Sequence, residues 1–169
     1  MNKSIKINNN NLPLLPQDVI IPTYIRSEVK VGIVHIGIGG FHRAHQAYYT
    51  DELLQNNGVL DCGICGIGLL DADRKIINTL KDQDGLYTLL IKESDGSLKP
   101  RVIGSIVEFL FAPDNPVAVI EKMADPEIKV ISLTITEGGY NYNETTGEFD
   151  FSTPSIQWDL KNPDNPKTV

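Results

Sequence analysis

The chain has 169 residues, 41% of them hydrophobic and 22% charged, which is typical of one globular domain with its own core. Lysine and arginine total 15 against 22 aspartates and glutamates, so the formal net charge is −7. This balance disfavours nucleic acid and anionic membrane surfaces as partners, since both need excess positive charge. Without a long apolar run or a signal peptide, the sequence predicts a cytoplasmic protein with no membrane or nucleic-acid partner.

Residues 1–28 are expected to form a flexible lead. Pro13, Pro16 and Pro22 interrupt any helix there, and the scattered aliphatic side chains are suited to drape over a larger body. The pattern then changes, because residues 29–36 form a β-branched run with few charges. Such a run predicts a strand that is buried on both faces.

A glycine cluster at residues 37–40 ends this strand, and residues 43–56 have the pattern of a helix that ends near Gly58. A second buried strand is predicted at residues 62–69. The helix expected at residues 72–81 follows it, with Asp71 as its N-cap.

The remainder of the chain is predicted to add one hairpin, one helix and one strand. In order, these are extended segments at 86–91 and 101–109 joined by a turn at 94–96, a helix at 115–123 and a strand at 128–135. Beyond residue 141 the sequence is polar and contains several prolines, and no closing element is expected there.

Strands that alternate with helices predict an α/β fold, because parallel neighbours need crossover connections. We therefore expect a Rossmann-like parallel sheet with flanking helices and a small β-hairpin. The elements supply about half of a doubly wound fold, since a second mononucleotide half is not evident. Residues 29–169 are accordingly predicted to be an incomplete, truncated dinucleotide-binding domain.

The turn after the first strand has the pattern of a phosphate cradle. At Gly37 the backbone must turn tightly, and at Gly39 a side chain would collide with an approaching pyrophosphate. The following helix offers unpaired N–H groups to that phosphate, and Arg43 would add a direct charge. The alternative is a purely structural β–α turn. The residues predicted to bind the cofactor here are Gly37, Ile38, Gly39, Gly40, Phe41, His42 and Arg43.

His42 stands where the pattern G-x-G-x-x-G has its third glycine. That glycine normally permits close packing of the helix on the strand, so the turn must pack differently at this position. His42 and His45 are spaced for one helix face, but zinc needs three or four ligands and no further ligand is placed to help. No metal site is expected.

An NAD site also needs a carboxylate at the tip of the second strand, where it accepts hydrogen bonds from the ribose hydroxyls. Asp71 and Asp73 have this location, although both are also suited to cap the next helix, and one can cap while the other binds. Arg74 and Lys75 leave room for a 2′-phosphate. NAD is therefore the expected cofactor, with NADP as the alternative.

Cys62 and Cys65 form a C-x-x-C pattern that in other settings indicates a redox pair. Such pairs act at helix N-termini, whereas these two lie in an apolar strand-like run. Successive side chains of a strand alternate between faces, so the two thiols point apart. Buried, inert cysteines are the prediction.

The turn sequence Gly-x-Gly-x-Phe-His-Arg-Ala-His-Gln at residues 37–46 resembles the signature of the long-chain mannitol dehydrogenase family of polyol dehydrogenases. Stretches at residues 65–74, 83–89 and 132–140 resemble the mannitol 2-dehydrogenase branch of that family. The resemblance runs from about Pro22 to the last residue. It accounts for the missing third glycine, because the family has Phe-His-Arg there.

The resemblance implies that a polyol such as D-mannitol is oxidised to a ketose such as D-fructose, with hydride transfer to NAD and no catalytic metal. It also implies a largely helical C-terminal domain that holds a catalytic lysine in a Lys-x-x-x-x-Asn-x-x-His motif. This sequence contains no such motif, so the chain alone is expected to be inactive. Its polyol or ketose partner would be bound through the missing domain.

Glu137 follows the last predicted strand and is the one candidate auxiliary residue, in proton passage or substrate contact. The alternative is a loop carboxylate that accepts backbone N–H bonds. Two functions stay open at this point: the cofactor part of a polyol oxidoreductase, and a catalytically silent dinucleotide-binding fragment or partner-dependent half. Uronate reductases and arabinitol dehydrogenases are alternatives within the family.

Overall fold

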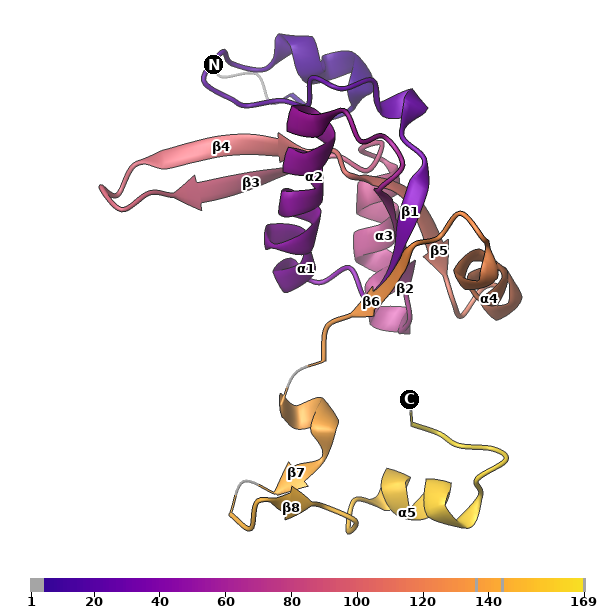
Figure 1. Ribbon diagram of the computed structural model, residues 1–169. Coiled ribbons are helices and arrows are strands. Elements are labelled where there is room, and N and C mark those ends of the chain that lie inside the picture. Colours follow the sequence, from indigo (N-terminus) through magenta and orange to yellow (C-terminus); the bar gives the residue numbers. More distant parts are fainter. Residues whose placement is uncertain (1–4, 136, 144, 169) are drawn as a thin grey trace. The chain divides into compact units, whose positions relative to one another are not determined.

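The computed structural model describes residues 5–135, 137–143 and 145–168 (Figure 1). It consists of two compact units, Met1–Leu133 and Thr134–Val169. Within the described ranges, no helix combines the length and apolar character needed to cross a lipid bilayer.

The first unit is built on a four-stranded sheet with the order β5-β2-β1-β6. The strands are β1 (Val31–Ile36), β2 (Gly63–Gly68), β5 (Ile106–Phe111) and β6 (Val130–Leu133). All three strand pairs are parallel. The chain adds β2 and β5 on one side of β1 and then crosses to add β6 on the other side, so the strand order reverses at β1. The predicted Rossmann-like parallel sheet is confirmed.

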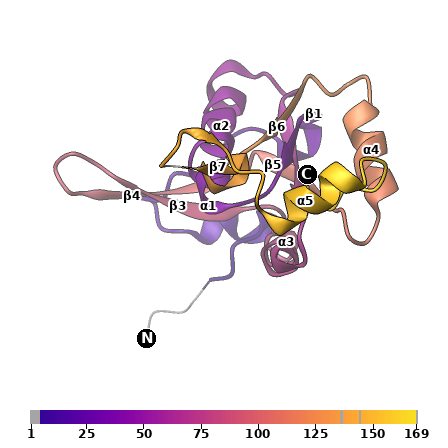
Figure 2. The ribbon, with the colours of Figure 1, turned by 90° about the horizontal axis from the view of Figure 1, so that it is seen from below.

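Helices cover both faces of this sheet (Figures 1 and 2). They are α1 (Gly40–Ala44), α2 (Gln46–Asn57), α3 (Arg74–Lys81) and α4 (Pro116–Ala124). Ala47 of α2 and Ile77 of α3 pack with Ile64 and Ile106 in one core cluster. Val119 of α4 packs with alternate strand residues in a second cluster. Burial of both faces explains why the strands are apolar runs without alternation.

The helix predicted after the glycine turn is observed as two helices, α1 and α2. They are separated at His45, whose backbone (φ −121°, ψ −85°) is not helical. Helical structure already begins at Gly40, three residues before the predicted start, so only residues 37–39 separate β1 from the first helical turn. The predicted end is confirmed, because Gly58 adopts the left-handed conformation of a helix C-cap (φ 62°).

The predicted hairpin is confirmed, but its second arm is shorter than expected. β3 (Tyr87–Lys92) pairs with β4 (Leu98–Ile103), whereas the rest of the predicted arm belongs to β5 of the main sheet. The break lies at Gly104, whose N–H donates to Asp51 Oδ1 at 2.9 Å and whose carbonyl accepts from Arg26 Nε at 3.0 Å. The partners that hold the bend lie 53 and 78 residues away in sequence, so no local pattern reveals it.

Residues 5–28, the described part of the segment expected as a flexible lead, contact the rest of the first unit at several points. It contains the 3-10 helices η1 (Asn9–Leu14) and η2 (Arg26–Glu28). Ile20 forms a bridge with Arg101 of β4, and Tyr24 donates to Asp51 at 2.6 Å. These contacts hold the segment against β4 and α2.

The second unit contains regular structure where no closing element was expected. Its elements are η4 (Glu137–Tyr140), the antiparallel pair β7 (Tyr142–Asn143) and β8 (Glu148–Phe149), and α5 (Pro154–Lys161). Proline occupies the start of α5, where its missing N–H costs no intrahelical bond. Asp159 then accepts bonds from the N–H groups of Lys167 and Thr168, so the polar tail folds back on the helix.

Candidate functional site

The carboxyl ends of parallel strands lie at one edge of the sheet, and three loops of the first unit follow these ends. They are the glycine turn after β1, residues 69–73 after β2 and residues 112–115 after β5. The glycine turn adjoins the point where the strand order reverses. In open α/β sheets this is the place where ligands bind.

The glycine turn has the two backbone properties that the sequence predicts. Gly37 has a φ of +90°, which is strained for any residue with a side chain, and its N–H donates to Ile67 of β2 at 2.8 Å. Gly39 and Gly40 are exposed, and a Cβ built on either meets no described atom within 4 Å. The backbone of these two glycines is therefore open to an approaching ligand.

Gly39 is the N-cap of α1, so the N–H groups of the first turn have no acceptor within the helix. Gly40 and Phe41 are both exposed there, and Phe41 stacks on His45 at 4.1 Å. Unpaired N–H groups at the start of a helix attract anions. Together with the open glycines, they fit the pyrophosphate of a dinucleotide.

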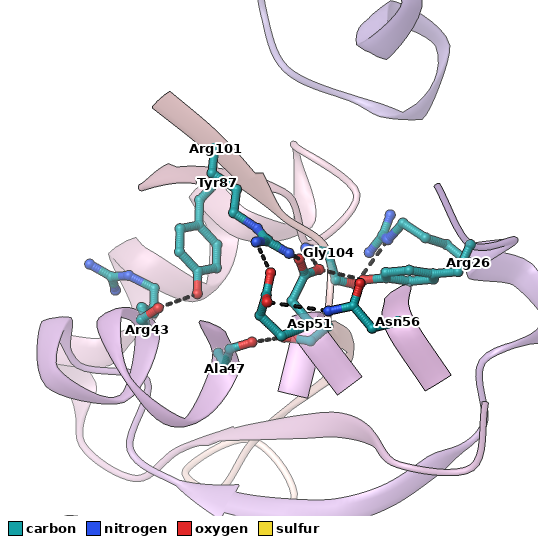
Figure 3. Close-up of polar contacts among 11 residues, drawn as sticks. Arg26, Arg43, Ala47, Asp51, Asn56, Tyr87, Arg101 and Gly104 are labelled. Atoms are coloured by element: carbon teal, nitrogen blue, oxygen red, sulfur yellow. Dashed lines mark hydrogen bonds and ion pairs between the residues drawn. The ribbon is translucent and has the colours of Figure 1, made fainter. Parts of the chain in front are cut away.

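Arg43 supports the turn from beneath. Its Nη1 donates to the Ile38 carbonyl at 2.7 Å. Figure 3 shows its second contact, in which the Arg43 carbonyl accepts from the Tyr87 hydroxyl at 2.6 Å. The Ile38 side chain is 1% exposed and packs in the core. Both residues thus hold the turn in shape, and Ile38 offers only its backbone to the edge.

His42 fills the place of the missing third glycine with a ring stack. Its ring lies 3.7 Å from that of His35 in β1, with an angle of 12° between the planes, and both rings are buried. Gln46 hydrogen-bonds to Nδ1 of His42, and Ser132 hydrogen-bonds to Nδ1 of His35. Gln46 and Ser132 also hydrogen-bond to each other. The sequence predicted different packing at this position but missed the contacts of Ser132, because Ser132 lies 86 residues from Gln46 and 97 residues from His35 along the chain.

Burial determines the protonation of this histidine pair. Desolvation lowers the pKa of His42 to about 3, with a further contribution from the neighbouring His35, and desolvation also lowers the pKa of His35. Among the described residues, neither Nε2 atom has a hydrogen-bond partner. The pair is therefore neutral at pH 7, and the His42 ring lies within the fold beneath the turn.

Asp71 and Asp73 have different environments at the end of β2. Asp73 Oδ2 accepts from the N–H groups of Leu69 and Leu70, each at 3.0 Å, whereas the Asp71 side chain is 89% exposed. The predicted N-cap was therefore wrong in its residue, because α3 begins at Arg74 and has Asp73 as its N-cap, with the Asp73 carboxylate bound to the backbone that precedes the helix. Asp71 is left as the accessible carboxylate at the strand tip.

A cation–carboxylate pair lies beside Asp71. Both terminal nitrogens of Arg74 donate to the Asp114 carboxylate, at 3.0 and 2.8 Å, and the guanidinium lies 4.2 Å from the Phe111 ring centroid. Asp114 follows β5, so this pair joins two neighbouring loops of the same edge. Of Arg74 and Lys75, the two cations that could bind a 2′-phosphate, Arg74 is thus already paired with Asp114.

The remaining candidates from the sequence lie away from this edge or outside the description. Cys62 and Cys65 are buried free thiols whose pKa values burial raises, that of Cys65 to about 12. Among the described residues, no three His, Cys, Asp or Glu side chains gather as a metal site. Glu137 begins η4 in the second unit, and its side chain lies outside the described residues.

Several known polyol dehydrogenases are similar to this chain in sequence or structure. A family model described as the mannitol dehydrogenase Rossmann domain matches residues 31–169. Mannitol 2-dehydrogenase from Aspergillus terreus is 51% identical over 169 residues, which cover 97% of this chain and 33% of the relative. The Pyricularia oryzae enzyme of the same name is 51% identical over 155 residues, which cover 90% and 31%.

Two solved structures share the fold. Pseudomonas fluorescens mannitol 2-dehydrogenase, in a ternary complex with NAD and D-mannitol, matches with a TM-score of 0.83 and 49% identity over 98% of this chain. D-sorbitol dehydrogenase in substrate-free form matches with a TM-score of 0.78 and 43% identity over 96%. The match covers 34% of each solved chain. The present chain thus spans about a third of the length of its relatives.

Proposed function

The chain belongs to the mannitol dehydrogenase family, and we propose that it is the NAD-binding part of a polyol oxidoreductase of the mannitol 2-dehydrogenase type. Such an enzyme oxidises D-mannitol to D-fructose and reduces NAD to NADH. One observation carries the proposal: the glycine turn with open space at Gly39 and Gly40 shares the sheet edge with the exposed carboxylate of Asp71. These groups are the ones that the pyrophosphate and a ribose of NAD require.

Each residue of the edge has a defined task in this proposal. The backbone N–H groups of Gly39, Gly40 and Phe41 donate to the pyrophosphate, and Asp71 accepts hydrogen bonds from the ribose hydroxyls. Arg43 and Asp73 hold the two loops in shape. NAD, when bound, supplies the acceptor for the hydride.

The engaged Arg74 favours NAD over NADP. A 2′-phosphate needs free cations at the strand tip, but Asp114 already binds the Arg74 guanidinium through two hydrogen bonds. Asp71 adds a negative charge 4.0 Å from the same guanidinium. The surroundings therefore suit a neutral ribose hydroxyl better than a phosphate.

Oxidation of the polyol also needs a base that removes the hydroxyl proton while hydride leaves the carbon. In this family the base is expected to be the lysine of the Lys-x-x-x-x-Asn-x-x-His motif, which these 169 residues do not contain. The chain by itself is therefore proposed to bind the dinucleotide without turnover, with Glu137 as a candidate auxiliary in proton passage. The choice between mannitol, an arabinitol and a uronate is expected to depend on residues outside this sequence.

Two measurements on the purified chain test the proposal. In the first, isothermal titration calorimetry with NADH is expected to give saturable binding with one site per chain. In the second, the absorbance at 340 nm is followed with D-mannitol and NAD, and no NADH is expected to form. A folded chain that takes up no NADH would refute the cofactor site. Mannitol-dependent NADH formation would show that the base lies within these residues.

A further inference from the structure

In the Arg74–Asp114 pair, the carboxylate of Asp114 occupies the donors of Arg74 that would otherwise bind a phosphate. Arginine recognises phosphate with two parallel N–H donors, and Arg74 uses this same fork on the Asp114 carboxylate at 3.0 and 2.8 Å. The guanidinium also lies 4.2 Å from the centroid of the Phe111 ring, so its position is fixed from two directions. A phosphate that approached Arg74 would have to displace Asp114 first.

The pair also lies where a 2′-phosphate would arrive. Arg74 opens α3 directly after the loop that carries Asp71, and Asp114 belongs to the loop that follows the neighbouring strand β5. Half of the Arg74 side chain is exposed, so solvent and ligands reach it. The hydrogen bond between the partners raises the pKa of Arg74 and lowers the pKa of Asp114, so both are charged at pH 7.

We infer that Asp114 is a cofactor-specificity residue, which selects NAD by keeping the Arg74 guanidinium away from the 2′-phosphate of NADP. This inference rests on the proposed function, since it assumes that the ribose lies beside Asp71. Asp114 acts through Arg74 in this account and needs no contact with the cofactor. Its removal is therefore expected to change the preference between the two cofactors more than the affinity for NADH.

The test compares NADH with NADPH in fluorescence titrations of the full chain, since both cofactors carry the same fluorophore. The substitution Asp114→Ala is expected to strengthen NADPH binding about tenfold relative to NADH, because a bidentate arginine–phosphate contact becomes available. Arg74→Ala in the wild-type background is expected to leave the ratio of NADPH affinity to NADH affinity within about twofold of the wild-type value, because Arg74 is already bound to Asp114. The double variant Arg74→Ala/Asp114→Ala is expected to show none of the increase in NADPH affinity that Asp114→Ala gives.

Two control variants separate the pair from the general effect of charge. Asp82→Ala removes the same charge from the other end of α3, at its C-cap, and is expected to keep the wild-type ratio. Asp114→Glu retains a carboxylate that can reach Arg74 and is expected to restore most of the preference for NADH. Thermal melts followed by circular dichroism confirm that each variant is folded.

The outcomes distinguish this inference from the proposed function. A wild-type chain that is folded but binds neither NADH nor NADPH contradicts the proposed function. A wild-type chain that binds NADH, together with an unchanged ratio in Asp114→Ala, contradicts the role of Asp114 alone. An equal increase in relative NADPH affinity in Asp82→Ala and Asp114→Ala would also contradict the role of Asp114, since the effect would then come from the net charge of the chain.

Discussion

The first unit contains two polar regions that differ in how completely their groups are paired. In the clamp, defined as Asp51 of α2 with Tyr24, Arg101 and Gly104, the carboxylate is fully buried and accepts hydrogen bonds from all three partners (Figure 3). At the sheet edge, the Asp71 carboxylate is 89% exposed and faces one cation at 4.0 Å. Both are aspartates beside helices of one sheet, yet only the second is available to a ligand.

Hydrogen-bond pairing, and not residue type, separates structural from functional groups in this chain. The clamp joins α2, the hairpin and the N-terminal segment, so its polar groups form their hydrogen bonds within the fold. At the edge, the exposed N–H groups and the Asp71 carboxylate remain open. Substitutions at Asp51, His42 and Asp71 test this division, and the loss of stability that we expect decreases in that order.

Asp51→Ala is expected to have the largest effect. It leaves the Arg101 guanidinium, whose side chain is 6% exposed, without its buried partner, and it removes the acceptor of Tyr24 and Gly104. Breaking a buried ion pair in this way costs about 3–5 kcal/mol. Urea denaturation followed by circular dichroism measures this loss in the free energy of unfolding.

Glu52→Ala is the matched control, because Glu52 also contacts Arg101 but its side chain is 36% exposed. The Glu52–Arg101 pair is only partly buried, and solvent screens its exposed side, so this variant is expected to lose about 1 kcal/mol or less. Equal losses in the two variants would contradict the account, since burial would then not decide the value of the pair.

The His35–His42 stack is expected to make the folded state sensitive to acid. The folded chain holds the pKa of His42 at about 3, below the unfolded value of 6.5, so the unfolded state takes up the proton first as the pH falls. The free energy of unfolding is therefore expected to fall by about 1.4 kcal/mol per pH unit from this group, between pH 6.5 and a pH of about 3. Stability is fully recovered above pH 6.5.

His42→Phe removes the titrating group and keeps an aromatic ring that can stack on His35. The difference in unfolding free energy between wild type and variant, measured from pH 7 to pH 4.5, isolates the contribution of His42 from that of the carboxylates. The variant is expected to show the shallower decline. Parallel curves for the two proteins would mean that His42 is not held neutral by burial.

Asp71→Ala is expected to have the smallest effect on stability. An exposed side chain outside any cap or buried pair changes the free energy of unfolding by no more than about 0.5 kcal/mol. NADH binding is nevertheless expected to weaken, because the ribose loses its acceptor. A marked drop in the melting temperature would show that Asp71 stabilises the fold, as Asp51 does, and would contradict its assignment as a group left free for a ligand.

The sequence predicted the sheet and its edge because the signals for them are local. Apolar runs, the Gly37 turn and the Asn115-Pro116 helix start each depend on a few neighbouring residues, and all are observed. The open backbone at Gly39 follows from the same local pattern. These features could be predicted because the backbone conformation and burial of a short segment suffice to define them.

The clamp and the contact of Ser132 with the histidine stack could not be predicted in the same way. Asp51 finds its partners 27, 50 and 53 residues away, and the Ser132 contact to His35 spans 97 residues. Such contacts exist only once the sheet order has brought the segments together. The same reason explains the misplaced hairpin arm, because the bend at Gly104 is held by Asp51 and Arg26.

NADH binding by the variant Gly39→Val tests directly whether the glycine turn is the cofactor site. The thermal stability of the variant is measured in parallel. Gly39 has an ordinary extended backbone (φ −68°), and its Cβ position is open, so the fold accepts the substitution. Calorimetric titration is expected to show at least about a hundredfold weaker NADH binding, with the melting temperature close to that of the wild type, because the added side chain occupies the place of the pyrophosphate. Unchanged NADH affinity in this folded variant would contradict the claim that the glycine turn is the cofactor site.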